Sequence, residues 1–492
     1  MFAGLDIGST NAKFSIYEGG GRLLAEASSG YILTDAGESL TTEAIWNAVQ
    51  HVIGTACKQL PVKGQITAMA ITTFGESLVP VDSNGRVLSD RFTCSSIEGD
   101  EELKEILEAI PAEEIRNISG VFPHKRFPLV KMLWFKYHSP LYEKISRYLT
   151  MEDFIIHRLT GRFALSDSSA ARTMAYDRKN HCWSRVLLEL PGVEVDKLSE
   201  ILPSGAYVGT VLQEVCYELG LWGKIKVFTG GHDQMCNSIG AGLCGSDMIV
   251  NCSGTVECIS GIANLKQAEA IMQALPLQFA PFPEQSESCF TFWAPVAGCS
   301  SLDWCLRLTS GCFQMKDREL AERHISIQAI CSDKPSPLLT APYFTGRNYP
   351  DYAGQVSGFV SGMNLQTTPE ELYQSIMEGI TFELKICLER FGELSAGGQK
   401  MIVVGGGAQS DYWMQMKANI TKQQIVRLKH RQSGTMGSML LAAVGAGYYR
   451  DLGQATAECV KVKKIFHPEK RLSRIYEEKF EQYLNFRNSM EL

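Results

Sequence analysis

The chain has no excess of basic charge and no apolar run long enough to span a bilayer. Its 47 lysine and arginine residues are outnumbered by 54 aspartate and glutamate residues, which gives a formal net charge of −7 over 492 residues. The longest apolar stretches, such as SMLLAAVGAGYY, fall short of the roughly 18–20 residues that a membrane helix needs. Neither nucleic acid nor a membrane is therefore an expected partner.

The sequence predicts no secretory leader, and it contains no closely spaced cysteine pair. Its start, MFAGLDIGST, has no basic segment and no small-residue cleavage site, so a cytoplasmic location is expected. Cys236, Cys244, Cys252 and Cys258 cluster in sequence but form no Cys-x-x-Cys pair, the spacing that aims two thiolates at one zinc ion. In a reducing compartment we expect these cysteines to be small buried side chains.

No low-complexity linker divides the chain, although its length suggests two large domains. Hydrophobic residues make up 45% of it, which is enough to build two cores. The start reads as three strands separated by turns, followed by a helical pattern over 42–60 and another strand over 66–74. This order indicates an α/β protein with mixed strand directions.

A weak internal repeat indicates two related halves. FAGLDIGSTNAKFSIY near the start and DMIVNCSGTVECIS from residue 247 both place glycine with serine or threonine between two apolar strands. The predicted boundary falls near CGSD, at 244–247, which gives domains over 1–245 and 246–492.

The first motif with chemical potential is DIGSTNAK, at residues 6–13. A glycine between strands lets backbone N–H groups turn toward an anion, and hydroxyl and amide side chains add donors. The residues that offer such groups, together with a positive charge, are Gly8, Ser9, Thr10, Asn11 and Lys13. Asp6 is suited to orient a hydrated Mg²⁺, because hard cations prefer oxygen ligands and keep their waters. A plain polar hairpin turn has the same composition, and that interpretation stays open.

Two further glycine-containing turns lie in the second half. NCSGT, at 251–255, offers Gly254 and Thr255 as a second phosphate cradle, although Ser-Gly-Thr turns also simply join strands. VVGGGAQSDYW, at 403–413, places three glycines between a strand and a helix, where a flat or charged ligand can approach the backbone. Its spacing is not that of a dinucleotide fold, and a tight strand-to-helix turn is the alternative.

Asp233 stands in GGHDQ, after a strand and two glycines and before small apolar residues. An aspartate in such a crowded position can take a proton from an attacking hydroxyl. The alternative is a helix N-cap, since aspartate caps well and its charge suits a helix N-terminus. Considered alone, the motif favours the cap, and the neighbouring His232 is expected to be structural.

The combination of these motifs is more informative than each motif alone. Two anion-binding hairpins, a glycine-rich strand-to-helix turn and one carboxylate base are what phosphoryl transfer requires. That chemistry depends on positioning, charge neutralisation and a base near the acceptor hydroxyl, with little covalent help. The sequence therefore indicates phosphoryl transfer to a hydroxyl group.

The same motifs resemble the FGGY family of carbohydrate kinases, and the resemblance runs nearly end to end. GLDIGSTNAK is similar to the family's opening phosphate motif, GGHDQMCNSIGAG to its catalytic-aspartate segment, NCSGT to its second phosphate hairpin and VVGGGAQSDYWMQMKANI to its adenosine motif. GFVSGMNLQTTPEELYQSIMEG, at 358–379, is similar to its downstream signature. The resemblance implies an α/β fold class with two ribonuclease-H-like domains of the actin and hexokinase superfold and an interdomain cleft.

The resemblance also implies roles for individual residues. Asp233 is implied as the general base on the sugar hydroxyl, and Asp6 as the residue that assists Mg²⁺. The residues implied around the phosphates of ATP are Gly8, Ser9, Thr10, Asn11, Lys13, Gly254 and Thr255. Those implied against the adenosine are Gly406, Gly407 and Ala408. The candidates for sugar contacts, besides Asp233 itself, are Phe74, Gly75 and Glu76 in TTFGES.

Two departures from the family pattern concern the sugar. Many relatives carry an Asp-x-Arg pair where this chain has Ser96 and Glu98, and an anion in place of a cation alters the hydrogen-bonding polarity toward a substrate. The Met-His pair of xylulose kinases is also missing, with Gly75 and Glu76 in its place, whereas ITTFG is similar to the fuculose kinases. A solvated loop carboxylate is the alternative for Glu76.

The sequence thus predicts an ATP-dependent kinase that phosphorylates a hydroxyl of a small sugar, such as a pentulose, a deoxy-hexulose or a polyol, with Mg–ATP. The expected partners are that sugar and ATP, and the resemblance weakly suggests a homodimer. A nucleotide-binding sensor of the same fold is the alternative, favoured by the altered sugar segment and opposed by the intact Asp6 and Asp233. A chaperone-like or cytoskeletal ATPase is opposed by the signature at 358–379.

Overall fold

The chain forms two compact units. The computed structural model describes residues 1–31, 40–60, 65–93, 98–266, 268–269, 277–284, 288–346, 356–392 and 400–489. Unit 1 comprises Met1–Cys244, Leu277–Thr291 and Gln432–Val460, and unit 2 comprises Gly245–Pro276, Phe292–Arg431 and Lys461–Leu492. The predicted domains, 1–245 and 246–492, stay a prediction. The compact units also separate after Cys244, and they place two later segments with unit 1.

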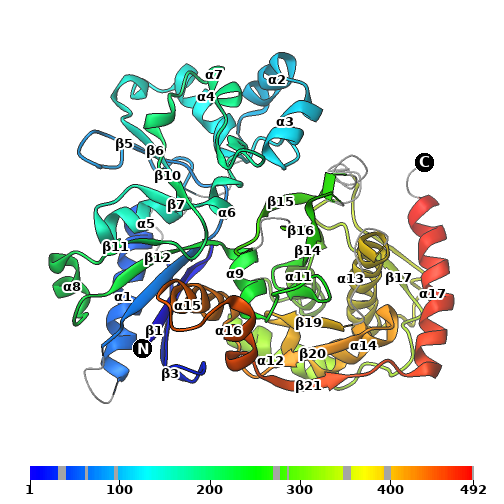
Figure 1. Cartoon of the computed structure of the whole chain (residues 1–492). Coiled ribbons are helices and arrows are strands. Elements are labelled where there is room, and N and C mark those ends of the chain that lie inside the picture. Colours follow the sequence, from blue (N-terminus) through cyan, green and yellow to red (C-terminus); the bar gives the residue numbers. More distant parts are fainter. Residues whose placement is uncertain are drawn as a thin grey trace. The chain divides into compact units, whose positions relative to one another are not determined.

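Unit 1 is built on a six-stranded sheet (Figure 1). Its strands, in sheet order, are β11 (Tyr207–Thr210), β12 (Lys226–His232), β4 (Ala68–Thr73), β1 (Phe2–Ile7), β2 (Asn11–Tyr17) and β3 (Leu23–Gly30). Strand β1 pairs antiparallel with β2 and parallel with β4, which confirms the mixed strand directions. The carboxyl ends of β1, β4 and β12 therefore lie at one edge of the sheet, where the sequence motifs follow.

Different helices cover the two faces of β1, because side chains alternate along a strand. Leu5 shares a buried cluster with Ile45 and Val49 of α1 (Thr42–Gln59), the helix predicted over 42–60. On the opposite face, a Cβ on Gly4 would lie 1.9 Å from the backbone oxygen of Thr435 in α15 (Ser433–Gly445). This late helix thus packs directly on the first strand, beside α9 (Asp233–Gly240), as Figure 1 shows.

The remaining elements of unit 1 are shorter, and most fall between β4 and β12. The helices are α2 (Asp100–Ala109), α3 (Ala112–Ser119), α4 (Pro128–His138), α5 (Met151–Thr160), α6 (Asp167–Ala170), α7 (Arg185–Glu189), α8 (Gln213–Leu219) and α16 (Leu452–Cys459). The strands are β5 (Val79–Val81), β6 (Arg147–Leu149), β7 (Ala164–Ser166), β8 (Tyr176–Asp177), β9 (Cys182–Trp183), β10 (Glu200–Leu202) and β15 (Gln278–Pro281).

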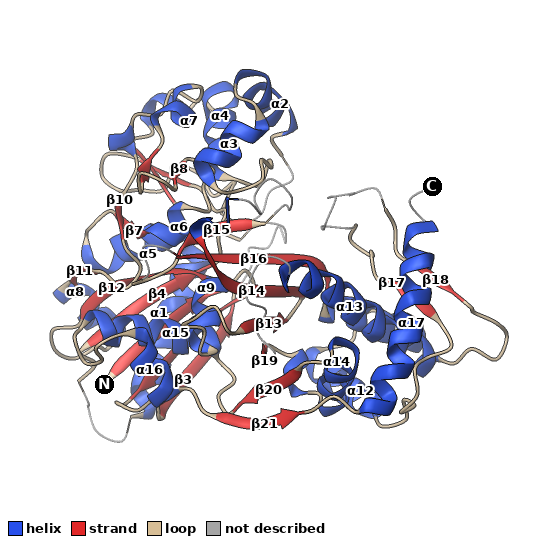
Figure 2. Ribbon diagram, turned by 45° about the vertical axis from the view of Figure 1, so that its right-hand side comes forward, coloured by secondary structure: helices blue, strands red, loops and turns tan. Residues whose placement is uncertain are grey.

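Unit 2 repeats the strand pattern of unit 1. From β16 onward its sheet runs in the order β16 (Ser288–Ala297), β14 (Val256–Asn264), β13 (Ile249–Ser253), β19 (Lys400–Val404), β20 (Gln424–Leu428) and β21 (Val462–Phe466) (Figure 2). Strand β13 pairs antiparallel with β14 and parallel with β19, as β1 does with β2 and β4. The predicted internal repeat is therefore a repeat of topology. The strand pair β17 (Leu339–Ala341) and β18 (Phe359–Ser361) stands apart.

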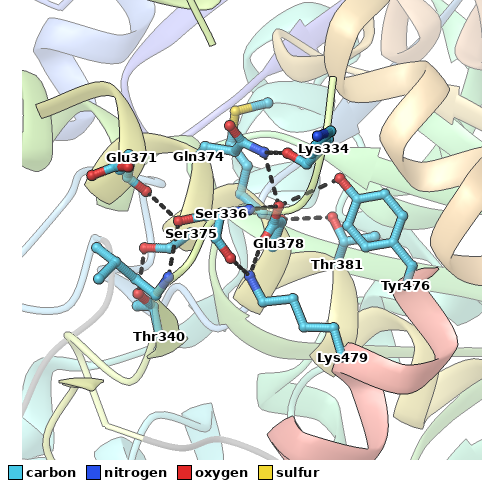
Figure 3. A network of polar contacts seen from close by, with 12 residues as sticks. Lys334, Ser336, Thr340, Glu371, Gln374, Ser375, Glu378, Thr381, Tyr476 and Lys479 are labelled. Atoms are coloured by element: carbon cyan, nitrogen blue, oxygen red, sulfur yellow. Dashed lines mark hydrogen bonds and ion pairs between the residues drawn. The ribbon is translucent and has the colours of Figure 1, made fainter. Parts of the chain in front are cut away.

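The helices of unit 2 pack around Trp413 and several buried tyrosines. They are α11 (Cys299–Ser310), α12 (Asp317–Gln328), α13 (Pro369–Gly392), α14 (Asp411–Thr421) and α17 (Lys470–Ser489). An ion pair between Lys479 of α17 and Glu378 of α13 fastens the last helix (Figure 3). Glu378 also accepts from the backbone N–H of Ser336 at 2.9 Å and from Gln374 at 3.0 Å. Its partners satisfy a carboxylate that is otherwise costly to bury.

Candidate active site

The polar groups of the first hairpin lie in and beside the loop at 8–10, which joins β1 to β2. Gly8 donates its N–H to the carbonyl of Asn11 at 2.9 Å and accepts from the hydroxyl of Tyr31 at 2.6 Å. Ser9 and Thr10 at the tip are exposed. Lys13 is the register partner of Asp6, so both side chains lie on the same face of the sheet. The sequence left the direction of Lys13 open, and the strand register now sets it.

Asp6 is buried on the face that α15 covers. Burial raises the pKa of its carboxyl, and the opposed Lys13 lowers it in part. The first turn of α15 lies against this carboxylate, since a Cβ on Gly434 would be 2.5 Å from Asp6 Oδ2. A helix N-terminus favours negative charge, so α15 and Lys13 both act against the effect of burial on the pKa of Asp6.

The two glycines before Asp233 lie in strand β12, at a shift of its register against β4, where there is no room for side chains. A Cβ on Gly230 would lie 2.1 Å from the backbone oxygen of Ile71 in the neighbouring strand. This end of β12 is held by hydrogen bonds with three other residues. Glu152 accepts from the N–H of Gly230 at 3.1 Å, Thr72 donates to the carbonyl of Gly231 at 2.8 Å, and Ser168 accepts from the N–H of His232 at 3.1 Å. These hydrogen bonds fix the position of Asp233, which follows His232.

Asp233 is the first residue of α9, and the N-cap is His232, which makes no side-chain capping bond. The N-cap interpretation of Asp233 is therefore wrong by one position. Its side chain is 23% exposed and lies 3.2 Å from the ring nitrogen of His232. Burial raises the pKa of Asp233 to about 7, and the charges of Asp6 and Glu76 act in the same direction. Burial lowers the pKa of His232 to about 3, so this ring is neutral at pH 7.

Glu76 lies close to Asp233 in a buried polar cluster. Its carboxylate pairs with Arg172, which also donates to Gln278, and its backbone oxygen accepts from Lys131. The side chains of Arg172 and Glu76 are 4% and 15% exposed, so a solvated loop carboxylate is the wrong description. Burial would raise the pKa of Glu76, but Arg172 and other nearby cations outweigh it and lower the pKa to about 2. Glu76 is therefore ionised.

The other residues of the predicted sugar segment adjoin the same cluster. Phe74 is buried and donates its N–H to the carbonyl of Ile7 at 2.9 Å. A Cβ on Gly75 would lie 3.1 Å from the ring of His232. Glu98 accepts two hydrogen bonds of 2.9 Å from the guanidinium of Arg91. Ser96 lies outside the described residues.

Three features of this site were missed by sequence reasoning. Glu152 and Ser168 fix the end of β12 before Asp233, and Arg172 pairs with Glu76, a residue 96 positions away. All three residues lie in YLTMEDFIIHRLTGRFALSDSSAARTMAYD, and the sequence of this stretch does not indicate which residues its polar side chains bind. The contact of α15 with Asp6 was also missed, since the SGTMGS segment reads only as a run of small residues.

The predicted nucleotide residues of the second half all lie in unit 2. Gly254 and Thr255 form the tip of the β13–β14 hairpin, and Thr255 is exposed. Gly406 has open space where a side chain would stand, whereas Gly407 and Ala408 are buried in a short turn before α14. The structure thus groups the phosphate and adenosine candidates of this half on neighbouring parallel strands, β13 and β19.

Comparison with known proteins places the chain in a family. The model of the FGGY family of carbohydrate kinases, N-terminal domain, matches residues 1–240, and that of the C-terminal domain matches residues 250–446. The chain belongs to the FGGY family of carbohydrate kinases. It is accordingly a carbohydrate kinase, a phosphotransferase with an alcohol group as acceptor, and kinases of this family use ATP.

Individual relatives agree in length with the whole chain. The xylulose kinase of Bacillus subtilis (strain 168) is 26% identical over 489 residues, which cover 98% of this chain and 95% of that protein. The L-fuculokinase of Escherichia coli (strain K12) is 25% identical over 475 residues, covering 94% and 96%. A crystal structure of ligand-bound xylulose kinase from Lactobacillus acidophilus superposes with a TM-score of 0.85, at 22% identity over 99% of this chain and 98% of that one.

The described helices include none with the length and apolar character of a membrane span. Groups of three or more His, Cys, Asp or Glu side chains that could hold a metal ion are likewise absent from the described residues. A metal used with ATP is typically held by one or two carboxylates, by water and by the phosphates themselves. The buried Asp6 fits that kind of site.

Proposed function

We propose that this kinase transfers the terminal phosphoryl group of Mg–ATP to a hydroxyl of a small ketose or polyol, with Asp233 as general base. The observation that carries the proposal is the environment of Asp233. A carboxyl with a pKa of about 7, held between the end of β12 and the start of α9 and still partly accessible, can accept a proton near neutral pH. Loss of that proton to Asp233 makes the acceptor oxygen a better nucleophile as the new O–P bond forms, while the bond from the terminal phosphorus to the bridging oxygen breaks and ADP leaves.

The remaining predicted residues suit the parts of Mg–ATP. In unit 1, Asp6 would hold the ion through its water shell, and the residues that would contact the phosphates are Gly8, Ser9, Thr10, Asn11 and Lys13. In unit 2, Gly254 and Thr255 would contact the phosphates as well. The open space beside Gly406 suits the adenosine, because a side chain there would fill it. Bound Mg²⁺ would neutralise phosphate charge, and the protein residues would fix the geometry.

The polar cluster around Glu76 favours a neutral, hydroxylated substrate. Arg172 binds one carboxylate oxygen of Glu76 and also binds Gln278, so its charge is already compensated. A carboxylate held in this way accepts hydrogen bonds from sugar hydroxyls. A substrate carboxylate would instead meet Glu76 and Asp233 as like charges. The similarity to proteins named xylulose kinase and L-fuculokinase supports a ketose. The homodimer and the cytoplasmic location stay predictions.

The direct test is a coupled ADP-release assay of the purified protein with Mg–ATP across pentuloses, hexuloses, deoxy-ketoses, polyols and aldonates. We expect a neutral ketose or polyol to raise ADP release by roughly 10²-fold or more over the sugar-free rate, because a bound hydroxyl is held in position for attack and water is not. Binding of ADP without stimulation by a compound of any class would favour the nucleotide-binding sensor and reject the kinase assignment of this site. Stimulation by aldonates alone would reject the role proposed for Glu76.

The raised pKa of Asp233 predicts how activity depends on pH. The base must be deprotonated, so kcat/KM for the sugar should fall below a midpoint near pH 7, by about tenfold per pH unit. Glu76→Gln removes a charge that raises this pKa, and the midpoint should therefore move to lower pH, whatever its effect on KM. Rate profiles from pH 5 to 9 measure both. An unchanged midpoint in Glu76→Gln would show that another group controls the acid limb.

A further inference from the structure

A buried ion pair lies next to the second hairpin, outside the set of residues predicted from the sequence. Lys417 of α14 pairs with Glu257 of β14, and neither side chain has any exposed surface. Lys417 Nζ also donates to Asn251 Oδ1 at 2.6 Å and to Ser253 Oγ at 3.2 Å. Apolar side chains of similar volume are often as stable as a buried ion pair. Stability alone therefore does not account for the pair.

Ser253 connects this pair with the glycine loop that precedes α14. Its hydroxyl donates to Glu257 Oε2 at 2.9 Å while it accepts from Lys417. A Cβ on Gly407 would lie 2.3 Å from Ser253 Oγ, and one on Gly405 would lie 2.6 Å from the carbonyl oxygen of Ser253. The loop thus packs directly against the serine that Lys417 and Glu257 hold in place.

The start of α11 holds the hairpin from another direction. The carbonyls of Gly254 and Thr255 accept from the N–H groups of Cys299 and Gly298, each at 2.8 Å. In a trans peptide the N–H points opposite to the carbonyl, so the N–H groups of Thr255 and Val256 point away from α11. An anion on the side of the hairpin away from α11 would face the N–H groups of Thr255 and Val256. Their direction depends on the hairpin staying where α11 and the ion pair hold it.

We infer that Lys417 and Glu257 are positioning residues for the nucleotide, a role that rests on the proposed function. Through Ser253 they fix the second phosphate hairpin relative to the glycine loop, so that phosphates and adenosine of one ATP are bound together. Neither residue touches the nucleotide, because both are fully buried. Their loss should weaken nucleotide binding and leave the sugar residues of unit 1 unaffected.

The test compares Lys417→Met with a matched variant, Lys479→Met. Lys479 also forms a buried ion pair with a glutamate in unit 2, but its partners in Figure 3 are Glu378 and Ser336, not the hairpin. Both variants leave a buried carboxylate unpaired, so both should lower Tm. Only Lys417→Met should raise the Kd of Mg–ADP and the KM of ATP, by roughly 10- to 100-fold, the usual result of a small misplacement of binding groups. The KM of the sugar should change by less than about twofold, since unit 1 is intact.

A double variant separates positioning from folding. Lys417→Met/Glu257→Gln leaves no unpaired charge, so its Tm should recover toward that of the wild type. The amide introduced by Glu257→Gln cannot replace the links from Lys417 to Asn251 and Ser253, and the Kd of Mg–ADP should stay raised. Recovery of both Tm and Kd in the double variant would assign Lys417 a structural role only and overturn the inference.

Direct titration of Mg–ADP, followed by calorimetry, keeps this test distinct from the test of the kinase reaction. Equal Kd values in the wild type, Lys417→Met and Lys479→Met would overturn the positioning role even if the wild type phosphorylates a sugar. A raised Kd in Lys417→Met alone would support it even if no sugar stimulates ADP release. A wild-type protein that binds no ADP would overturn both proposals.

Discussion

Asp233→Asn is expected to lower kcat by roughly 10²- to 10⁴-fold, because the amide cannot accept the proton of the attacking hydroxyl. The shape of the side chain is nearly unchanged, so binding of Mg–ADP should be retained. Tm should stay the same or rise, since the charge that is removed is buried and close to Asp6 and Glu76. Steady-state kinetics, ADP titration and thermal unfolding measure the three expectations.

Asp100→Asn provides the control. Asp100 is also the first residue of a helix, α2, but it pairs with Lys125 at 2.7 Å and is exposed. We expect its kcat to stay within about twofold of the wild type, as for most exposed substitutions. Turnover by Asp233→Asn at a near-normal rate would reject the general base. A fall in Tm that matches the fall in kcat would assign Asp233 to folding instead.

Local elements and motifs could be predicted from the sequence because their signals are local. The helix over 42–60 has apolar residues at helical spacing, and the structure places α1 at Thr42–Gln59. The two hairpins with Gly8 and Gly254 at their tips were predicted from strand, turn and strand patterns, and both form. Glycine permits backbone conformations that other residues avoid, so it marks turns that can be predicted without knowing the rest of the fold.

Long-range partners could not be predicted in this way. Glu76 and Arg172 are 96 positions apart, and the stretches around them contain other carboxylates and arginines that make different pairs. The alternative of a solvated Glu76 was reasonable because most glutamates are exposed. Only the fold brings this glutamate to Arg172 and Asp233. The same holds for Lys417, whose buried acceptors lie about 160 residues earlier in the chain.

Helix α15 shows most clearly what the sequence conceals. Its residues are apolar or small on every side, so the sequence has no polar stripe that would indicate which face is buried. It belongs to unit 1, although most of that unit comes from the first half of the chain. Helix α15 packs on unit 1 through close contacts between backbones, which small residues allow because they have little or no side chain. The periodicity of apolar residues does not reveal such contacts.

The crossing of α15 and α9 leads to the second large expected effect, that of Gly437→Ala. A Cβ on Gly437 would lie 1.8 Å from the carbonyl oxygen of Cys236 and 2.9 Å from the N–H nitrogen of Gly240. Both are helix backbone, so the helices must separate, at a cost of about 1–3 kcal/mol or more. Because α9 begins with Asp233 and α15 contacts Asp6, we also expect kcat to fall by roughly 10²-fold, as misplaced catalytic groups generally cause.

Gly54→Ala makes the same chemical change in α1, where a Cβ would meet only the carbonyl oxygen of Leu219, at 3.9 Å. There the added methyl is accommodated, and the variant should gain about 0.5–1 kcal/mol from the lower conformational entropy of alanine in the unfolded chain, with unchanged kcat. If backbone contact between α9 and α15 holds Asp6 and Asp233 in place, the two variants should shift Tm in opposite directions. Only Gly437→Ala should then lose turnover. Equal and small effects would mean that the two helices tolerate separation and that Asp6 and Asp233 are positioned by their strands alone.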